Sequence, residues 1–197
     1  MVSGSNHMLK KILIALAAAL LILVVVVATR PADFTISRKA TVGAPPAVVF
    51  PHLNDFRKWN AWSPWVKLDP EAKFTFDGPD AGEGAKYAWS GNNQIGAGVG
   101  EIVESVPDEK VRVKLMFEKP FEATSEAQFD LRPEGAGTEV TWTMTGKNDF
   151  IGKAFALFMD VDEMAGTDFE EGLANLNKIL TSDPAPEAEP KSDTTPE

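Results

Sequence analysis

Tyr87 and Trp89 are the residues of this sequence whose types and spacing best suit a small-molecule site. They stand two positions apart in a short run bounded by turn residues, so a β-strand would place both side chains on one face, together with Gly91. Tyr87 is the only tyrosine of the chain, and it supplies the only phenol that could donate a proton or a hydrogen bond inside a cavity. Trp89 adds a large apolar surface. The pair predicts a pocket wall that combines apolar area with one hydroxyl group.

Other residue types that carry chemistry form no recognisable catalytic or metal-binding set. Apart from His7 near the N-terminus, His52 is the only histidine, and the chain has no nucleophile motif to partner it. Asp160, Asp162 and Glu163 cluster, but they lack the ligand spacing and the glycine of a calcium loop. The absence of cysteine excludes disulfides, zinc thiolate sites and thiol catalysis. We therefore predict no catalytic residue, no metal and no cofactor, and we favour binding over catalysis.

Gly96, Gly98 and Gly100 alternate within a run that has the pattern of a strand. A phosphate-binding loop is not indicated, because the residues that follow, GEIVES, do not begin a helix. Residues i, i+2 and i+4 of a strand share one face, so three missing side chains would leave a groove there. We expect this groove to make room for a C-terminal helix or for a ligand.

The segment Ala44–Trp65 has the most distinctive sequence of the chain, APPAVVFPHLNDFRKWNAWSPW. Its last four residues, WSPW at 62–65, resemble a signature of the START-like superfamily, also called SRPBCC or the polyketide cyclase/dehydrase and lipid-transport group. The resemblance implies an α+β helix-grip fold, in which a curved antiparallel sheet of about six to seven strands surrounds a long C-terminal helix and leaves a cavity between them. It also implies that the Tyr87 and Trp89 face points inward, and that part of the tryptophan motif is structural.

Hydrophobic periodicity predicts the elements of this fold. Phe34–Val42 alternates with period two, apart from Arg38, which places a charge on the apolar side. Asp149–Thr181 is expected to be helical, with a break near Asp160–Gly166 and an apolar stripe along one face. Short turns between consecutive strands indicate an antiparallel meander. Turn residues delimit further strands at Lys73–Asp77, Lys86–Ser90, Ala97–Val106, Val111–Glu118, Glu122–Leu131 and Glu139–Gly146.

The N-terminal region predicts a membrane segment. Residues Ile12–Ala28 are all Ile, Leu, Ala or Val, which is long enough for a short transmembrane helix. Lys10 and Lys11 precede the run and favour a cytoplasmic N-terminus, with the domain facing the periplasm or the exterior of a bacterial inner membrane. The alternative is a signal peptide that is cleaved before secretion. We assign residues 8–30 to an anchor or uncleaved signal, and residues 1–7 to a vector remnant or a misassigned start.

Composition sets the remaining boundaries. Residues 31–181 have the length of one domain with a single core, and residues 182–197, rich in Pro, Glu, Asp, Ser and Thr, are predicted to be a disordered acidic tail. The net charge of −10 makes nucleic acid an unsuitable partner, because phosphate binding needs a basic surface. The sequence does not determine an oligomeric state.

These observations predict a membrane-anchored protein that binds a hydrophobic small molecule or lipid in a cavity between sheet and helix. A cyclase or dehydratase that uses the same cavity is one alternative, and a protein-interaction module related to chaperone-activating members of the superfamily is another. The sequence does not identify the ligand. The candidate cavity residues are Tyr87, Trp89, Gly98, Phe117, Phe129, Trp142, Phe169 and Leu173.

Overall fold

The fold is given by a computed structural model that describes residues 3–182. Seven strands form one antiparallel sheet in the order β1-β7-β6-β5-β4-β3-β2. All sequential neighbours from β2 to β7 pair directly, so the predicted meander is confirmed, and β1 closes the far edge by pairing with β7. The strands are β1 Asp33–Val42, β2 Lys73–Asp77, β3 Lys86–Ser90, β4 Ala97–Val106, β5 Lys110–Lys119, β6 Ala123–Glu134 and β7 Gly137–Lys147.

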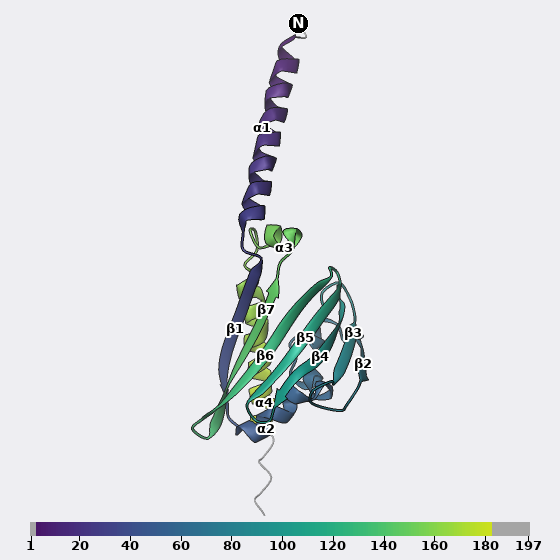
Figure 1. Cartoon of the computed structure of the whole chain (residues 1–197), viewed down its shortest axis with the longest axis vertical. Helices are drawn as coiled ribbons and strands as arrows, with labels where there is room; N and C mark the ends of the chain where they lie inside the picture. Colours follow the sequence, from purple (N-terminus) through teal and green to yellow (C-terminus); the bar gives the residue numbers. More distant parts are fainter. Residues whose placement is uncertain (1–2, 183–197) are drawn as a thin grey trace, which may run out of the picture.

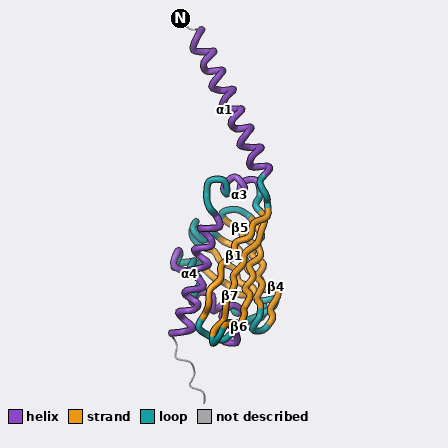
Figure 2. Tube along the Cα trace, turned by 90° about the vertical axis from the view of Figure 1, so that its left-hand side faces the viewer, coloured by secondary structure: helices purple, strands orange, loops and turns teal. Residues whose placement is uncertain are grey.

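Helices occupy one face of this curved sheet (Figures 1 and 2). The connection from β1 to β2 holds α2 (Pro46–Asn54) and two short 3₁₀ helices, η1 (Phe56–Ala61) and η2 (Val66–Leu68). The long helix α4 (Val161–Ser182) runs along the same face and contacts β1. The helix-grip architecture expected from the sequence is thereby confirmed.

The C-terminal helical segment is divided as predicted, but the break lies earlier than the expected Asp160–Gly166, because Asp160 caps a helix that is continuous from Val161. A short helix α3 (Phe150–Phe155) precedes α4, and residues 156–160 separate the two. Asp149 caps α3 by accepting a hydrogen bond of 2.7 Å from the backbone N–H of Gly152. Asp160 acts in the same way at the start of α4, where its carboxylate accepts the N–H of Glu163 at 3.0 Å. Both caps satisfy backbone donors that a helix start leaves free.

The strand β6 extends beyond its predicted end at Leu131. Pro133 and Glu134, which follow the predicted end of the strand, pair with Thr138 and Gly137 of β7. A proline has no N–H for a ladder, which normally confines it to sheet edges. The β5 ladder stops at Asp130, so at Pro133 the strand has a neighbour on one side only, and the missing donor leaves no partner unsatisfied.

Arg38, the charge on the apolar side of β1, joins the sheet to α4. Its guanidinium forms ion pairs of 3.0 Å with Asp162 and with Glu170, which lie two turns apart on α4. An added Cβ at Gly166, which lies between these two carboxylates along the helix, would collide with this guanidinium. The glycine therefore allows α4 to approach β1 closely enough for Arg38 to bridge both carboxylates.

The N-terminal helix α1 (Ser3–Thr29) projects away from the domain (Figure 1). Residues His7–Thr29 are long and apolar enough to cross a membrane, by length and composition, and their side chains are almost all exposed. An N-terminal signal sequence meets the same criterion. The helix begins at Ser3, so residues 3–7, which were assigned to a vector remnant or a misassigned start, are part of it. Of the predicted disordered tail, Ser182 ends α4 and the remainder lies outside the described residues.

Candidate ligand-binding cavity

A cavity of about 270 Å³ lies between the inner face of the sheet, α4 and the tryptophan-bearing segment that includes η1. Aromatic and aliphatic side chains form most of its wall, because successive inward positions of each strand carry large apolar residues. The sheet contributes Phe74, Tyr87, Trp89, Leu115, Phe117, Ala127, Trp142 and Met144. The rest of the wall is made by Trp59, Asn60, Ser63, Trp65 and Val66 of the tryptophan segment, by Gln94 and Ile95 of the turn between β3 and β4, and by Ala165, Asp168 and Phe169 of α4.

The structure brings five of the eight candidate residues together around this space: Tyr87, Trp89, Phe117, Trp142 and Phe169. The rings of Tyr87 and Trp89 stack with centroids 5.3 Å apart, and Phe117 meets Trp89 edge-on at 5.6 Å. Across the cavity, the ring of Phe169 lies parallel to the indole of Trp142 with centroids 4.1 Å apart. The stack joins α4 to β7 and forms one end of the cavity wall.

Gly98 does not line the cavity, and the groove predicted along the glycine strand is already filled. In the register of β3 with β4, Gly98 stands opposite Trp89 and Gly100 opposite Tyr87. An added Cβ at Gly98 would lie 2.6 Å from two carbons of the Trp89 ring. The rings of the neighbouring strand thus occupy the space that was expected to hold α4 or a ligand. Gly96 lies outside the strand, in a turn with φ of 64°.

Phe129 and Leu173 are core residues rather than cavity residues. Both are fully buried, and neither contributes to the cavity wall. Phe129 is covered by the indoles of Trp59 and Trp62, whose ring centroids lie 5.8 Å and 6.1 Å from its own. Inward direction on a strand or helix is therefore not sufficient to reach the cavity, because the tryptophan segment closes over this part of the sheet.

The WSPW motif divides between structure and cavity. Trp62 is almost fully buried and donates its indole N–H to the carbonyl of His52, as Trp59 does to that of Leu53. Trp65 instead lines the cavity and donates to the carboxylate of Asp168 on α4, at 3.0 Å. Sequence reasoning missed Trp65 and Asp168, since the motif indicated only that part of it would be structural.

Three polar groups near the cavity differ in how they are satisfied. The Trp89 indole donates to the carbonyl of Ile95 at 3.0 Å, which leaves no free donor. The indole N–H of Trp142 is buried and has no hydrogen-bond partner among the described residues. Burial raises the pKa of the Tyr87 phenol above its ordinary value, because desolvation disfavours the charged phenolate. Tyr87 is thus a neutral hydroxyl that can donate or accept.

Two carboxylates of the acidic cluster have structural roles. Asp160 caps α4 and Asp162 pairs with Arg38, as described above. Within residues 3–182, no group of three or more His, Cys, Asp or Glu side chains is arranged to hold a metal ion. His52 lies in α2, outside the cavity, and burial lowers its pKa from the ordinary value.

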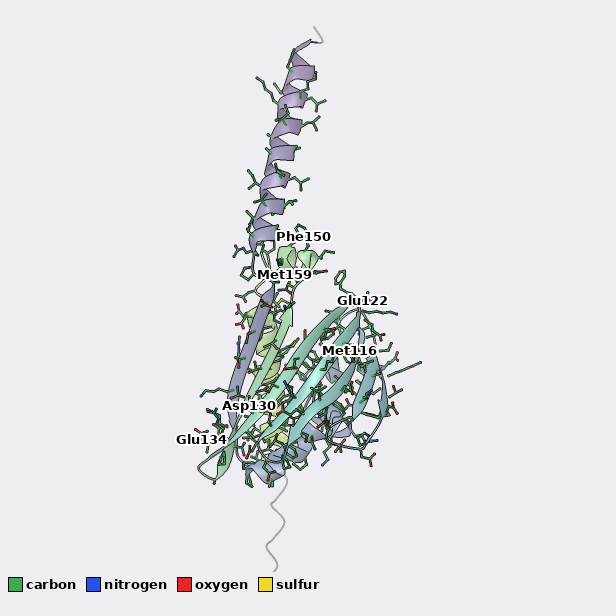
Figure 3. The ribbon with its side chains drawn as sticks, viewed as in Figure 1. Met116, Glu122, Asp130, Glu134, Phe150 and Met159 are labelled. Atoms are coloured by element: carbon green, nitrogen blue, oxygen red, sulfur yellow. The ribbon has the colours of Figure 1, made fainter. Side chains whose placement is uncertain are left out.

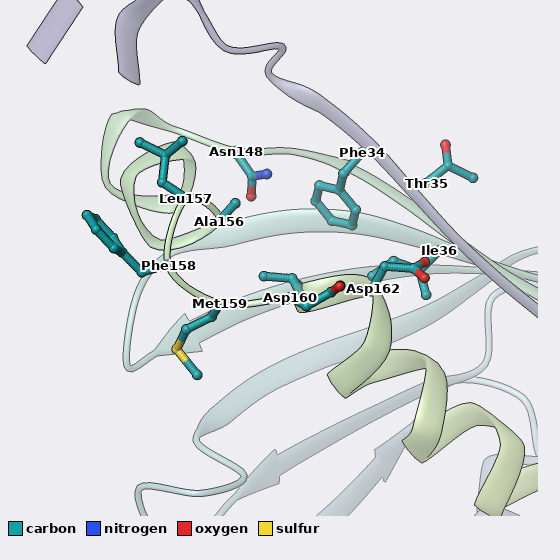
Figure 4. Close-up of a pocket in the computed structure, with 11 residues that line it drawn as sticks. Phe34, Thr35, Ile36, Asn148, Ala156, Leu157, Phe158, Met159, Asp160 and Asp162 are labelled. Carbon is teal, nitrogen blue, oxygen red and sulfur yellow. The ribbon is translucent and has the colours of Figure 1, made fainter. Parts of the chain in front are cut away.

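A second hollow, of about 490 Å³, lies at the end of the domain next to α1. It is a surface groove between the first residues of β1 and the connection from α3 to α4 (Figure 4). Phe34 and Ile36 face it from the strand, while Phe158 and Met159 come from the connection. Its shallow form and mixed lining suit a small ligand less well than the aromatic cavity does.

Comparison with known proteins supports the fold from independent sequence and structural data. Among solved structures, protein CV1439 from Chromobacterium violaceum superposes with a TM-score of 0.56 at 19% identity, over 76% of this chain and 98% of its own. Protein MLL2253 from Mesorhizobium loti gives 0.57 at 15% identity, over 77% and 99% of the two chains. The Aha1 dimer from Colwellia psychrerythraea gives 0.54 at 16% identity, over 75% and 96%.

Of the two sequence comparisons, only the one with family profiles finds a match. None of the curated proteins matches the chain. A family profile described as polyketide cyclase / dehydrase and lipid transport matches residues 33–181, which begin at β1 and end within the last turn of α4. The match therefore covers the whole sheet, the tryptophan segment and the long helix. The chain belongs to the polyketide cyclase / dehydrase and lipid transport family.

Proposed function

We propose that this protein is a membrane-anchored binding protein for a hydrophobic small molecule or lipid, held in the cavity between the sheet and α4. The observation that carries the proposal is the aromatic wall of that cavity, which includes Trp65, Tyr87, Trp89, Trp142 and Phe169. Few polar groups converge on it. Such a wall favours apolar ligands, because burial of apolar surface contributes about 25 cal/mol per Å².

The cavity volume and its polar groups narrow the ligand class. A volume of about 270 Å³ is just below the ~300–1,000 Å³ of typical ligand pockets, so it suits a small ligand or one end of a longer chain. The Tyr87 hydroxyl is a donor that lines the cavity and can serve a ligand, whereas the unpartnered indole N–H of Trp142 is buried within the wall. A ligand with one carbonyl or hydroxyl oxygen on an apolar body would use both properties of the site.

The proposed location follows from α1. An uncleaved α1 would hold the domain on the periplasmic or outer side of the inner membrane, with Lys10 and Lys11 on the cytoplasmic side. Cleavage of α1 as a signal peptide would instead release a soluble binding protein. The cavity is the same whether or not α1 is cleaved. Only the place where the protein binds its ligand differs, at the membrane or in solution.

Native mass spectrometry of the full-length chain, released from detergent, tests the binding proposal. We expect a bound small molecule that organic extraction recovers, and uptake of the apolar fluorophore N-phenyl-1-naphthylamine by protein from which it has been extracted. Trp89→Ala should weaken probe uptake, whereas Val48→Ala, at an exposed apolar position on α2, should not. Equal uptake by both variants and by the wild type would place probe binding outside the cavity and contradict the proposal.

A cyclase- or dehydratase-like activity is the second candidate. It is favoured by one observation, that a phenol and a carboxylate, Tyr87 and Asp168, both line the cavity. An acid and a base that face one substrate are the minimum for such chemistry. Against it, the Asp168 carboxylate is engaged by Trp65. An interaction module with a filled interior is disfavoured, because the cavity retains open volume.

A further inference from the structure

The end of the domain next to α1 carries an unusual concentration of exposed apolar side chains. We call it the apolar collar, defined by Phe121, Phe150, Ile151, Phe155, Phe158 and Met164, each at least half exposed. Outside α1, these are the only large apolar side chains of the described residues with that exposure. Such a patch on one end of a domain marks an interaction surface rather than random surface variation.

The collar comes from separate parts of the chain that lie at the same end of the domain. Phe150, Ile151 and Phe155 belong to α3, Phe158 to the connection after it, and Met164 to the first turn of α4. Phe121 lies in the turn between β5 and β6. Figure 3 shows Phe150, Met159 and Glu122, the neighbour of Phe121, at the end of the domain from which α1 projects.

Two features fix the distance between this collar and α1. The helix α3 contacts α1, and Val27 in the last turn of α1 is only 2% exposed, whereas Val24 and Val25 are 42% and 54% exposed. Only residues 30–32 connect α1 to β1. Three residues span at most about 10 Å. Whatever layer surrounds the last turn of α1 therefore also reaches α3.

We infer that the apolar collar inserts into the interfacial layer of the bilayer that α1 crosses, so that the domain lies on the membrane rather than on a free tether. The inference rests on the proposed anchoring by α1. Residues His7–Thr29 measure about 35 Å as a helix, slightly more than the ~30 Å hydrocarbon core. The last turn, and α3 beside it, then lie at the boundary between acyl chains and headgroups, where Phe and Ile side chains partition favourably.

Two residues of the collar lie close along the chain to residues of the cavity wall. Met164 precedes Ala165, and Phe121 stands four residues after Phe117. Insertion of the collar would therefore bring this part of the cavity wall near the bilayer. An apolar ligand could then pass between the membrane and the cavity without crossing bulk water, which is the transfer that its low solubility opposes.

Site-specific fluorescence on the full-length chain tests this inference. The chain contains no cysteine, so single-cysteine variants need no background substitutions. Phe158→Cys reports on the collar, Val48→Cys on an exposed apolar position of α2 at the opposite end of the domain, and Leu20→Cys on α1. Each is labelled with the environment-sensitive fluorophore NBD and reconstituted into phosphatidylcholine–phosphatidylglycerol liposomes with or without nitroxide lipids.

We expect the label at Phe158→Cys to emit at shorter wavelength than that at Val48→Cys and to lose intensity with nitroxides near the headgroups. The label at Leu20→Cys should respond to nitroxides deep in the acyl chains. If the label at Leu20→Cys is quenched by lipid but that at Phe158→Cys matches Val48→Cys and responds only to aqueous iodide, the anchor stands and the collar proposal fails. If neither is quenched by lipid, the anchor fails as well. A label at Phe158→Cys that is shielded from both lipid and iodide would indicate a protein partner, such as a second copy, and would also overturn the proposal.

Discussion

The phenol ring of Tyr87 lies directly over Gly100, the residue opposite it on the neighbouring strand. An added Cβ at Gly100 would lie 2.8 Å from Cδ1 of the ring and closer still to Cε1. The same relationship joins Trp89 to Gly98. Because the two glycines of β4 have no side chain, the two rings can lie flat against the sheet, where they form part of the cavity wall.

The first prediction concerns this contact. Gly100→Ala should lower the melting temperature, because overpacking of a tight site destabilises a fold by about 1–3 kcal/mol. The nearest atoms to the added methyl group are all side-chain atoms, of Tyr87 and Leu115. In a Tyr87→Ala background the same substitution should have much less effect. A double-mutant cycle measured by thermal unfolding checks this, and additive effects of the two changes would show that the ring and the glycine are not coupled.

The second prediction separates a carrier from a catalyst. Tyr87→Phe removes only the hydroxyl group and preserves the stack on Trp89. In a carrier, probe or ligand affinity should change by no more than about 1.5 kcal/mol, the scale of one neutral hydrogen bond. In an enzyme that uses the phenol as an acid, turnover should fall by about 10²–10⁴ with an unchanged melting temperature. Unaltered binding by both Tyr87→Phe and Trp89→Ala would place the ligand elsewhere.

The third prediction concerns pH. Burial raises the pKa of Tyr87 in the folded chain, so above the ordinary tyrosine pKa of ~10 the unfolded state releases this proton before the folded state does. The contribution of Tyr87 to the free energy of unfolding is therefore constant below pH ~10. It decreases as the pH rises from there toward the pKa that Tyr87 has in the folded state. Melting temperatures from pH 8 to 11 should decline more steeply for the wild type than for Tyr87→Phe. Parallel curves would show that the phenol is not desolvated.

The fourth prediction concerns Asp168, which accepts the indole N–H of Trp65 at 3.0 Å. Asp168→Asn keeps an acceptor oxygen, so it should leave the Trp65 fluorescence and the stability nearly unchanged. Asp168→Leu removes the acceptor and should destabilise the fold by about 1–3 kcal/mol, the penalty for an unsatisfied donor. Loss of turnover in Asp168→Asn, with wild-type stability, would identify the carboxylate as catalytic and overturn a purely structural role.

The fifth prediction concerns topology. An alkaline phosphatase reporter fused after Glu197 should be active in a bacterial host, because that enzyme folds productively only after export. Mass spectrometry of the purified chain should find the apolar segment of α1 intact. Activity of a cytoplasmic reporter at the same position would contradict the orientation. A mature N-terminus at Thr29 would show cleavage of the anchor, and would leave the orientation unaffected.

Much of the architecture was predictable from local patterns in the sequence. Period-two alternation and turn residues located β2, β3 and β4 at their observed bounds and the other strands to within three residues, because each pattern depends only on neighbours along the chain. The same reasoning placed Tyr87 and Trp89 on one face and anticipated a break before α4. Short turns indicated that consecutive strands pair, and the resemblance of the tryptophan motif supplied the rest of the architecture, in which the sheet surrounds the C-terminal helix.

Contacts between elements decided the rest. Phe129 and Phe117 have the same inward direction, yet only Phe117 reaches the cavity, because Trp59 and Trp62 cover Phe129. The glycines of β4 lie beneath rings of β3, a register that alternation cannot define. Trp65 meets Asp168 across 103 residues of sequence. The side chains that face the cavity were thus selected by packing between distant segments, whereas the sequence alone determined which faces of each strand and helix are apolar.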